Sequence, residues 1–137
     1  MKTLAPIIVA AAFAVACVPK PAKSYTSDEI GSLDSLSELM RIQADKADPL
    51  FGKTTFSDEE WALAADSGAI LQATAARIGA GFGGKGEYDD GFVDFANKLE
   101  AQAKALADAA VTKDAAAAGE ALSSMKATCS GCHGVYR

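Results

Sequence analysis

The chain has 137 residues, which suits a single domain, and its formal net charge is −5. Half of the residues are apolar, 23% are charged and 30 are alanine, the strongest intrinsic helix former. This composition predicts a folded all-α protein and argues against a β-sandwich or barrel, which needs more β-branched and aromatic residues. The acidic balance, without a basic patch, argues against a nucleic-acid partner.

The N-terminus has the features of a secretory signal. Residues 1–16 combine Lys2, an apolar run and an A-x-A cleavage site that ends at Ala16. The run is shorter than a membrane-spanning helix. Cleavage makes Cys17 the first residue of the mature chain, at the start of a tether over residues 17–26, and this arrangement resembles a bacterial lipoprotein site. We therefore expect a periplasmic protein, with either a lipid anchor on Cys17 or an ordinary signal peptide beside an unpaired cysteine.

Residues 27–137 are expected to form the folded domain. Apolar residues recur at alternating spacings of three and four in four segments, which is the period of helix faces packed against one another. The predicted helices cover residues 27–47, 58–78, 89–111 and 113–133. Similar lengths and short connections predict an antiparallel up-down four-helix bundle. Many inward positions are alanine or glycine, so a large apolar cofactor would fill the core.

Local signals mark the ends of these helices. Pro49 disfavours a helical residue before it and is expected to end the first helix. Ser57 and Glu60 form a capping-box pattern at the start of the second helix, with Phe56 placed for a hydrophobic staple. Thr112 is placed to cap the fourth helix.

A glycine-rich stretch follows the second helix. Gly79 is expected to cap that helix, and residues 79–86 are expected to form a flexible loop. The stretch also fits the G-x-G-x-x-G pattern of dinucleotide binding. That pattern needs a strand before it, and none is evident here, so we interpret the stretch as a connection between helices.

The chemistry is concentrated at the C-terminus, where residues 129–133 read C-x-x-C-H, the attachment signature of c-type haem. Cys129 and Cys132 lie on one helical face and can form thioethers with the two vinyl groups of one haem. The neighbouring His133 can then ligate the iron. A redox dithiol normally opens a helix rather than closing it, and a zinc site needs a fourth ligand. We therefore predict covalent haem c, one per chain.

A four-helix bundle with C-x-x-C-H on its last helix, followed by an aromatic–arginine pair, resembles the class II c-type cytochromes. These are cytochrome c′ and its low-spin relatives of the c-556 type. The specific part of the resemblance is residues 129–137. It implies that Cys129 and Cys132 carry the haem and that His133 is the proximal ligand. It also implies that Arg137 lies near that imidazole, the alternative being a solvated C-terminal charge.

The resemblance makes the sixth iron position decisive for function. In cytochrome c′ an apolar side chain of the first helix blocks the distal face, and the five-coordinate iron binds nitric oxide or carbon monoxide. In the c-556 type a methionine of the first helix is the ligand. Met40 lies on the inward stripe of the predicted first helix, so we expect it to be the distal ligand, the alternative being a packing methionine. Met125 is expected to pack beside the haem. Arg41 and Gln43 follow Met40, so a polar group on the distal side of the haem stays an alternative.

These features predict an exported haem protein that exchanges single electrons with redox partner proteins and is not an enzyme. One alternative is a five-coordinate binder of nitric oxide or carbon monoxide. The other is a haemless metal-binding or structural bundle. The acidic surface predicts a partner association that weakens with salt. A homodimer is common in the resembled family, although no stripe of residues requires one here.

Overall fold

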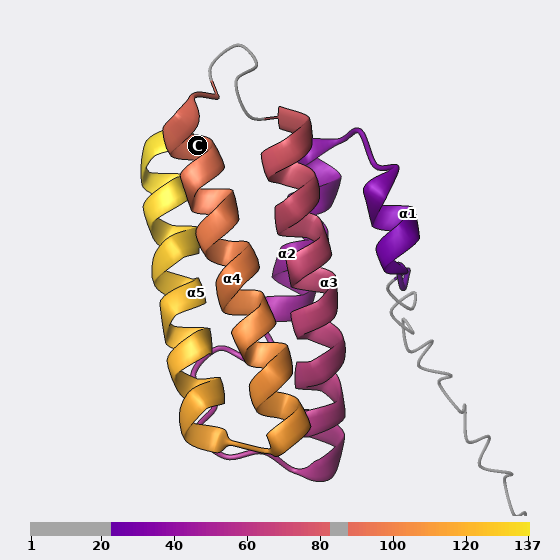
Figure 1. Ribbon diagram of the computed structural model, residues 1–137, viewed down its shortest axis with the longest axis vertical. Helices are drawn as coiled ribbons and strands as arrows, with labels where there is room; N and C mark the ends of the chain where they lie inside the picture. The colour runs from indigo at the N-terminus through magenta and orange to yellow at the C-terminus, as the bar shows by residue number, and fades with distance from the viewer. Residues whose placement is uncertain (1–22, 83–87) are drawn as a thin grey trace, which may run out of the picture.

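The computed structural model describes residues 23–82 and 88–137, which form an all-helical bundle (Figure 1). The helices are α1 (Ser27–Gly31), α2 (Leu36–Ala47), α3 (Asp58–Phe82), α4 (Asp90–Thr112) and α5 (Ala115–Tyr136). No strand occurs in these two stretches. Helices α2 to α5 run alternately up and down, which confirms the predicted bundle, and the short α1 lies outside it against α3.

The predicted signal segment and Cys17 lie outside the described residues. Across 23–82 and 88–137, none of the helices combines the length and the apolarity needed to cross a bilayer. Tyr25 belongs to the segment expected to be a tether, but its side chain is only 8% exposed and its hydroxyl donates a hydrogen bond to Glu38. The packed part of the chain therefore begins before α1.

Much of the core of the bundle consists of residues whose helical spacing predicted burial, whereas Leu39, Ile42 and Ile70 are buried without having been predicted. The residues that recur at spacings of three and four in the predicted helices 58–78 and 89–111 are all buried in α3 and α4: Trp61, Ala64, Gly68, Leu71, Ala75, Ile78, Phe92, Ala96, Leu99, Ala103, Leu106 and Ala110. The two helices approach each other closely at Gly68. A β-carbon there would lie 2.8 Å from the backbone nitrogen of Ala107 and 2.9 Å from the carbonyl oxygen of Ala103. The absence of a side chain at Gly68 therefore sets the separation of α3 and α4.

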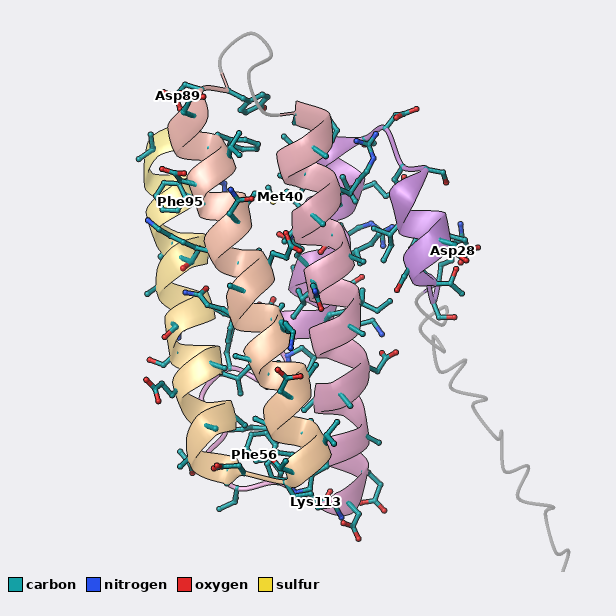
Figure 2. All side chains as sticks on the ribbon, in the orientation of Figure 1. Asp28, Met40, Phe56, Asp89, Phe95 and Lys113 are labelled. Atoms are coloured by element: carbon teal, nitrogen blue, oxygen red, sulfur yellow. The ribbon has the colours of Figure 1, made fainter. Side chains whose placement is uncertain are left out.

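The start of α3 has the predicted cap. The Ser57 hydroxyl oxygen accepts a hydrogen bond from the backbone nitrogen of Glu60 at 3.3 Å, and the Glu60 carboxylate accepts one from the backbone nitrogen of Ser57 at 2.8 Å. The rings of Phe56 and Trp61 stack with their centroids 4.3 Å apart. Both the capping box and the hydrophobic staple are thus confirmed. Figure 2 places Phe56 at the end of the bundle opposite to Asp89 and Phe95.

The prediction of one continuous helix over residues 27–47 is wrong, because residues 32–35 interrupt it. Ser32 ends α1 by donating its backbone N–H to carbonyl groups of that helix. Ser35 has an extended backbone, and its side chain caps the first turn of α2. Serine side chains and backbones form such local bonds readily, and Gly31 has a weak helix propensity, so these local signals outweigh the apolar spacing.

The end of α3 also differs from the prediction. Gly79 does not cap the helix, which continues to Phe82. The Phe82 ring packs against the core, and the Arg77 guanidinium lies 5.5 Å from its centroid. These contacts favour a further helical turn, which the glycine permits. The part of the predicted loop before residue 83 is therefore helical, and residues 83–86 lie outside the described residues.

The cap of α5 is Asp114 rather than Thr112. The Asp114 carboxylate accepts a hydrogen bond from the backbone nitrogen of Ala117 at 3.0 Å. Lys113 precedes it in the left-handed conformation (φ 54°) and ends α4. The Thr112 hydroxyl instead donates to carbonyl groups of α4. Aspartate is the stronger N-cap, which explains the shift in the boundary.

Candidate functional site

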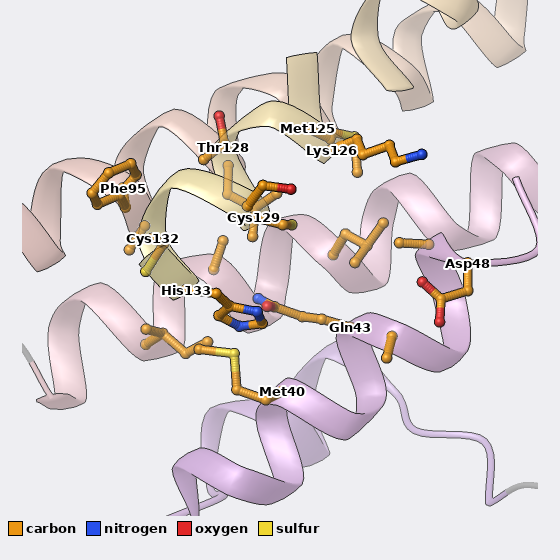
Figure 3. Close-up of a pocket in the computed structure, with 18 of the residues that line it drawn as sticks. Met40, Gln43, Asp48, Phe95, Met125, Lys126, Thr128, Cys129, Cys132 and His133 are labelled. Atoms are coloured by element: carbon orange, nitrogen blue, oxygen red, sulfur yellow. The ribbon is translucent and has the colours of Figure 1, made fainter. Parts of the chain in front are cut away.

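A cavity of about 300 Å³ lies between α2 and α5 (Figure 3). All four helices of the bundle contribute apolar side chains to its walls, among them Met40, Leu71, Phe95 and Met125. Several inward positions on the walls are alanine, and these small side chains leave the space open. The cavity lies where the thin core predicted a cofactor.

Cys129 and Cys132 lie one turn apart on α5 and both line the cavity. They are unpaired and partly buried. Burial raises the pKa of both thiols, and the neighbouring Cys132 and Asp48 raise the pKa of Cys129 further. A reactive dithiol needs a lowered thiol pKa, so this environment argues against a redox disulfide. The position of the two thiols on the cavity wall suits covalent attachment of a group inside it.

His133 and Met40 reach the cavity from opposite sides. His133 lies in the last turns of α5, and Met40 lies in α2. Figure 3 shows the imidazole and the thioether pointing toward one another across the space between the two helices. Imidazole nitrogen and thioether sulfur are the axial iron ligands of many c-type cytochromes. Folding thus brings together two residues that are far apart in the sequence.

The other predicted site residues lie as follows. Met125 is fully buried and lines the cavity one turn before Cys129. Arg137 follows the end of α5, one turn beyond His133, and is exposed. Its proximity to the imidazole stays a prediction. Within the two described stretches, no group of three or more His, Cys, Asp and Glu side chains is arranged to hold a metal ion.

The residues around the cavity fit a covalently attached haem. Cys129 and Cys132 would hold its edge, and His133 and Met40 would face its iron. The cavity walls are mostly apolar, as the porphyrin ring requires, and the thiols on the wall are unpaired. When bound, haem supplies one-electron exchange between ferric and ferrous iron.

Tyr136 ties the end of α5 to the start of α4, a role that its place in the aromatic–arginine pair does not reveal. Its hydroxyl donates a hydrogen bond to the Asp89 carboxylate. The same carboxylate caps α4 by accepting from the backbone nitrogen of Phe92 at 3.2 Å. The Tyr136 ring packs edge-on against Phe92 and Phe95, with centroids 5.3 and 6.3 Å apart. These contacts hold the turn of α5 that carries His133.

The hydrogen bond between Tyr136 and Asp89 predicts a pH-dependent contribution to stability. It raises the pKa of Tyr136 from its ordinary value of 10 to about 12, and together with the Phe92 backbone it holds the pKa of Asp89 below its usual range. The tyrosine contribution is therefore present below pH 10 and is lost as the pH rises through about 12. The aspartate contribution is present above the ordinary carboxylate range and is lost as the pH falls through the lowered pKa.

Tyr136→Phe should therefore lower the urea midpoint of unfolding at neutral pH. The difference in urea midpoint between Tyr136→Phe and the wild type should become smaller both in acid and above pH 10. Asp89→Asn is the matched control, because its amide oxygen can still cap α4 but does not titrate. In Asp89→Asn the loss of stability in acid that comes from protonation of Asp89 should be absent. A difference between the wild type and Tyr136→Phe that is constant from acid to alkaline pH would contradict this assignment.

Comparison with known proteins identified one family. Residues 87–137 match the family model described as Cytochrome C′. The match includes α4, α5 and the whole C-x-x-C-H sequence, and it confirms the resemblance seen in the sequence. No curated protein and no solved structure matched the chain. The similarity over residues 87–137 supports a class II c-type cytochrome, and the cytochrome c′ family implies covalently bound haem c.

Proposed function

We propose that this protein is an exported haem c protein that transfers single electrons without turning over a substrate. One haem per chain is attached to Cys129 and Cys132, and His133 and Met40 are its axial ligands. The observation that carries the proposal is the position of His133 and Met40 on opposite sides of one apolar cavity. Histidine–methionine ligation favours a low-spin iron whose surroundings rearrange little on reduction, and the thioether raises the potential.

The contribution of the chain is to hold both ligands in place. Leu39 and Ile42 are buried on one face of α2, and the Gln43 amide nitrogen donates a hydrogen bond to the Thr74 hydroxyl of α3 at 3.2 Å. These contacts fix the backbone on both sides of Met40, whose own side chain is flexible. The end of α5 is fixed by its aromatic contacts with α4. A ligand set on two fixed helices suits both oxidation states.

The expected location of the protein is the periplasm, because attachment of c-type haem requires an exported chain. A lipid on Cys17 would keep it at the membrane surface, and without the lipid it would diffuse. The formal net charge of −5 favours a redox partner with a basic contact surface. Such an encounter is fast at low salt and slows as the ionic strength rises.

Absorption spectra of the wild type and of Met40→Ala test the ligand assignment. We expect sharp split bands from the reduced wild type and a weak band at the red end of its oxidised spectrum, from methionine bound to ferric iron. Met40→Ala removes that ligand, so its reduced form should show broad high-spin bands that shift on adding carbon monoxide. Met125→Leu is the control, since it replaces the other methionine of the cavity with a side chain of similar volume.

Each alternative has its own signature in the same experiment. If carbon monoxide binds the wild type as readily as it binds Met40→Ala, Met40 does not occupy the sixth position of the iron. The gas-binding function would then replace electron transfer. Expression with a haem-maturation system that yields no covalent haem would favour a haemless bundle instead. Retention of the low-spin spectrum by Met125→Leu is required for the assignment to Met40.

A further inference from the structure

Gln43 is a buried polar side chain on the Met40 side of the cavity. It is 7% exposed, follows Met40 by three residues on α2 and lines the cavity with it. Figure 3 shows its carboxamide extending from α2 into the cavity, and its amide nitrogen donates a hydrogen bond to Thr74 of α3. Burying an amide is costly unless its polar atoms find partners. The hydrogen bonds of Gln43 therefore indicate what this side chain is suited to hold.

Thr74 determines which end of the Gln43 carboxamide faces the cavity. The Thr74 hydroxyl donates its one proton to the carbonyl oxygen of Leu71 at 2.9 Å. Its oxygen can then only accept a hydrogen bond. The Gln43 atom 3.2 Å from it is therefore the amide nitrogen Nε2. The hydrogen bond to Thr74 therefore leaves the amide oxygen Oε1 as an acceptor.

Besides Gln43 and His133, the polar side chains on the cavity wall are Asp48, Lys126, Thr128 and Ser130. Figure 3 shows Asp48 and Lys126 away from the end where Met40 and His133 face each other. Gln43 extends toward that end. Its Oε1 is therefore a polar acceptor on the same wall of the cavity as Met40.

We propose that Oε1 of Gln43 selects for distal ligands that carry a proton, water above all, and against carbon monoxide and nitric oxide. The proposal rests on the proposed function, since a distal ligand requires haem in the cavity. An amide oxygen stabilises a ligand with an O–H or N–H group by accepting a hydrogen bond. Carbon monoxide and nitric oxide have no proton to donate, so they gain nothing from it. The selection operates whenever Met40 is absent or displaced.

The test compares Met40→Ala with the double variant Met40→Ala/Gln43→Leu, both with covalent haem. Leucine has a similar volume and removes the acceptor. We expect the ferric single variant to hold water as its sixth ligand and the ferric double variant to be five-coordinate, as read by resonance Raman and electron paramagnetic resonance. The carbon monoxide affinity of the ferrous double variant should be higher by up to about tenfold, the equilibrium factor of one hydrogen bond.

Thr74→Val in the Met40→Ala background provides a second test that leaves Gln43 in place. Without the Thr74 hydroxyl the carboxamide can turn either end toward the cavity. The iron coordination and the carbon monoxide affinity of this variant should therefore lie between those of the other two variants. This variant also decides the matter if Gln43→Leu does not fold. Equal coordination and equal carbon monoxide affinity in all haem-bearing variants would overturn the proposal.

Failure of the proposed function has a different signature. If Met40→Ala leaves the wild-type spectrum unchanged, Met40 is not the ligand. The comparison of Gln43→Leu with the wild type itself then measures the same selection. A five-coordinate wild type whose carbon monoxide affinity is unaffected by Gln43→Leu would refute the role of Gln43 as well.

Discussion

Replacing both Cys129 and Cys132 with serine should give a protein from which acidified organic solvent removes all of the haem, whereas the wild-type polypeptide should retain it. A serine hydroxyl does not form the thioether, so only axial ligation and apolar contacts would remain, and denaturation abolishes both. The measurement is haem staining of the denatured polypeptide after extraction. The expected effect is complete loss of the covalently held fraction.

The single variants provide the control for this experiment. Cys129→Ser and Cys132→Ser each keep one thiol on the cavity wall, so each should retain haem through one thioether. The chain has three cysteines, and the third, Cys17, lies in the N-terminal segment outside the described residues. Haem that stays on the denatured double variant would therefore show attachment somewhere other than at the C-x-x-C-H sequence.

Gly68→Ala should destabilise the bundle, although alanine is the better helix former. The new β-carbon would lie within 3 Å of backbone atoms of Ala103 and Ala107, which cannot move without α4. Alanine adds about 1 kcal/mol of helix propensity, whereas overpacking costs about 1–3 kcal/mol and more when backbone must move. We expect a net loss of about 1–2 kcal/mol in the free energy of unfolding, measured by urea titration followed by circular dichroism.

Gly119→Ala is the matched control within α5. The nearest atom to its new β-carbon is the Lys53 carbonyl oxygen at 4.0 Å, an ordinary contact. Only the propensity gain remains, so this variant should be stabilised by about 0.5–1 kcal/mol. A shift of both variants in the same direction would show that the approach of α3 and α4 at Gly68 is not the reason for the glycine there.

The parts of the fold that depend on repeated spacing could be predicted from the sequence. The stripes of α3 and α4 are buried as predicted because many positions contribute to one periodic pattern, and errors at single residues do not matter. The break between α1 and α2 could not be predicted in the same way. It depends on Gly31, Ser32 and Ser35, whose local hydrogen bonds compete with the helix over a single turn.

The same distinction between local patterns and contacts among helices applies to the candidate site. The expected roles of Cys129, Cys132 and His133 come from their spacing, which itself indicates the chemistry, and the expected role of Met40 comes from the resemblance to a family. Partners in other helices were not predictable. The Tyr136–Asp89 hydrogen bond joins residues 47 positions apart and depends on how α4 and α5 pack.

The arrangement of the helices would give a bound haem a second role. Helix α2 packs against α3, α3 against α4, and α4 against α5, while the cavity occupies the fourth edge of the bundle, between α2 and α5. At the other three edges, helices that are consecutive in the chain pack directly on one another, and contacts between consecutive helices form fast. Ligation by Met40 and His133 would join segments about 90 residues apart in the sequence. Haem would thus act as a cross-link that closes the bundle, and the α5 thiols would stay accessible for attachment until α2 docks.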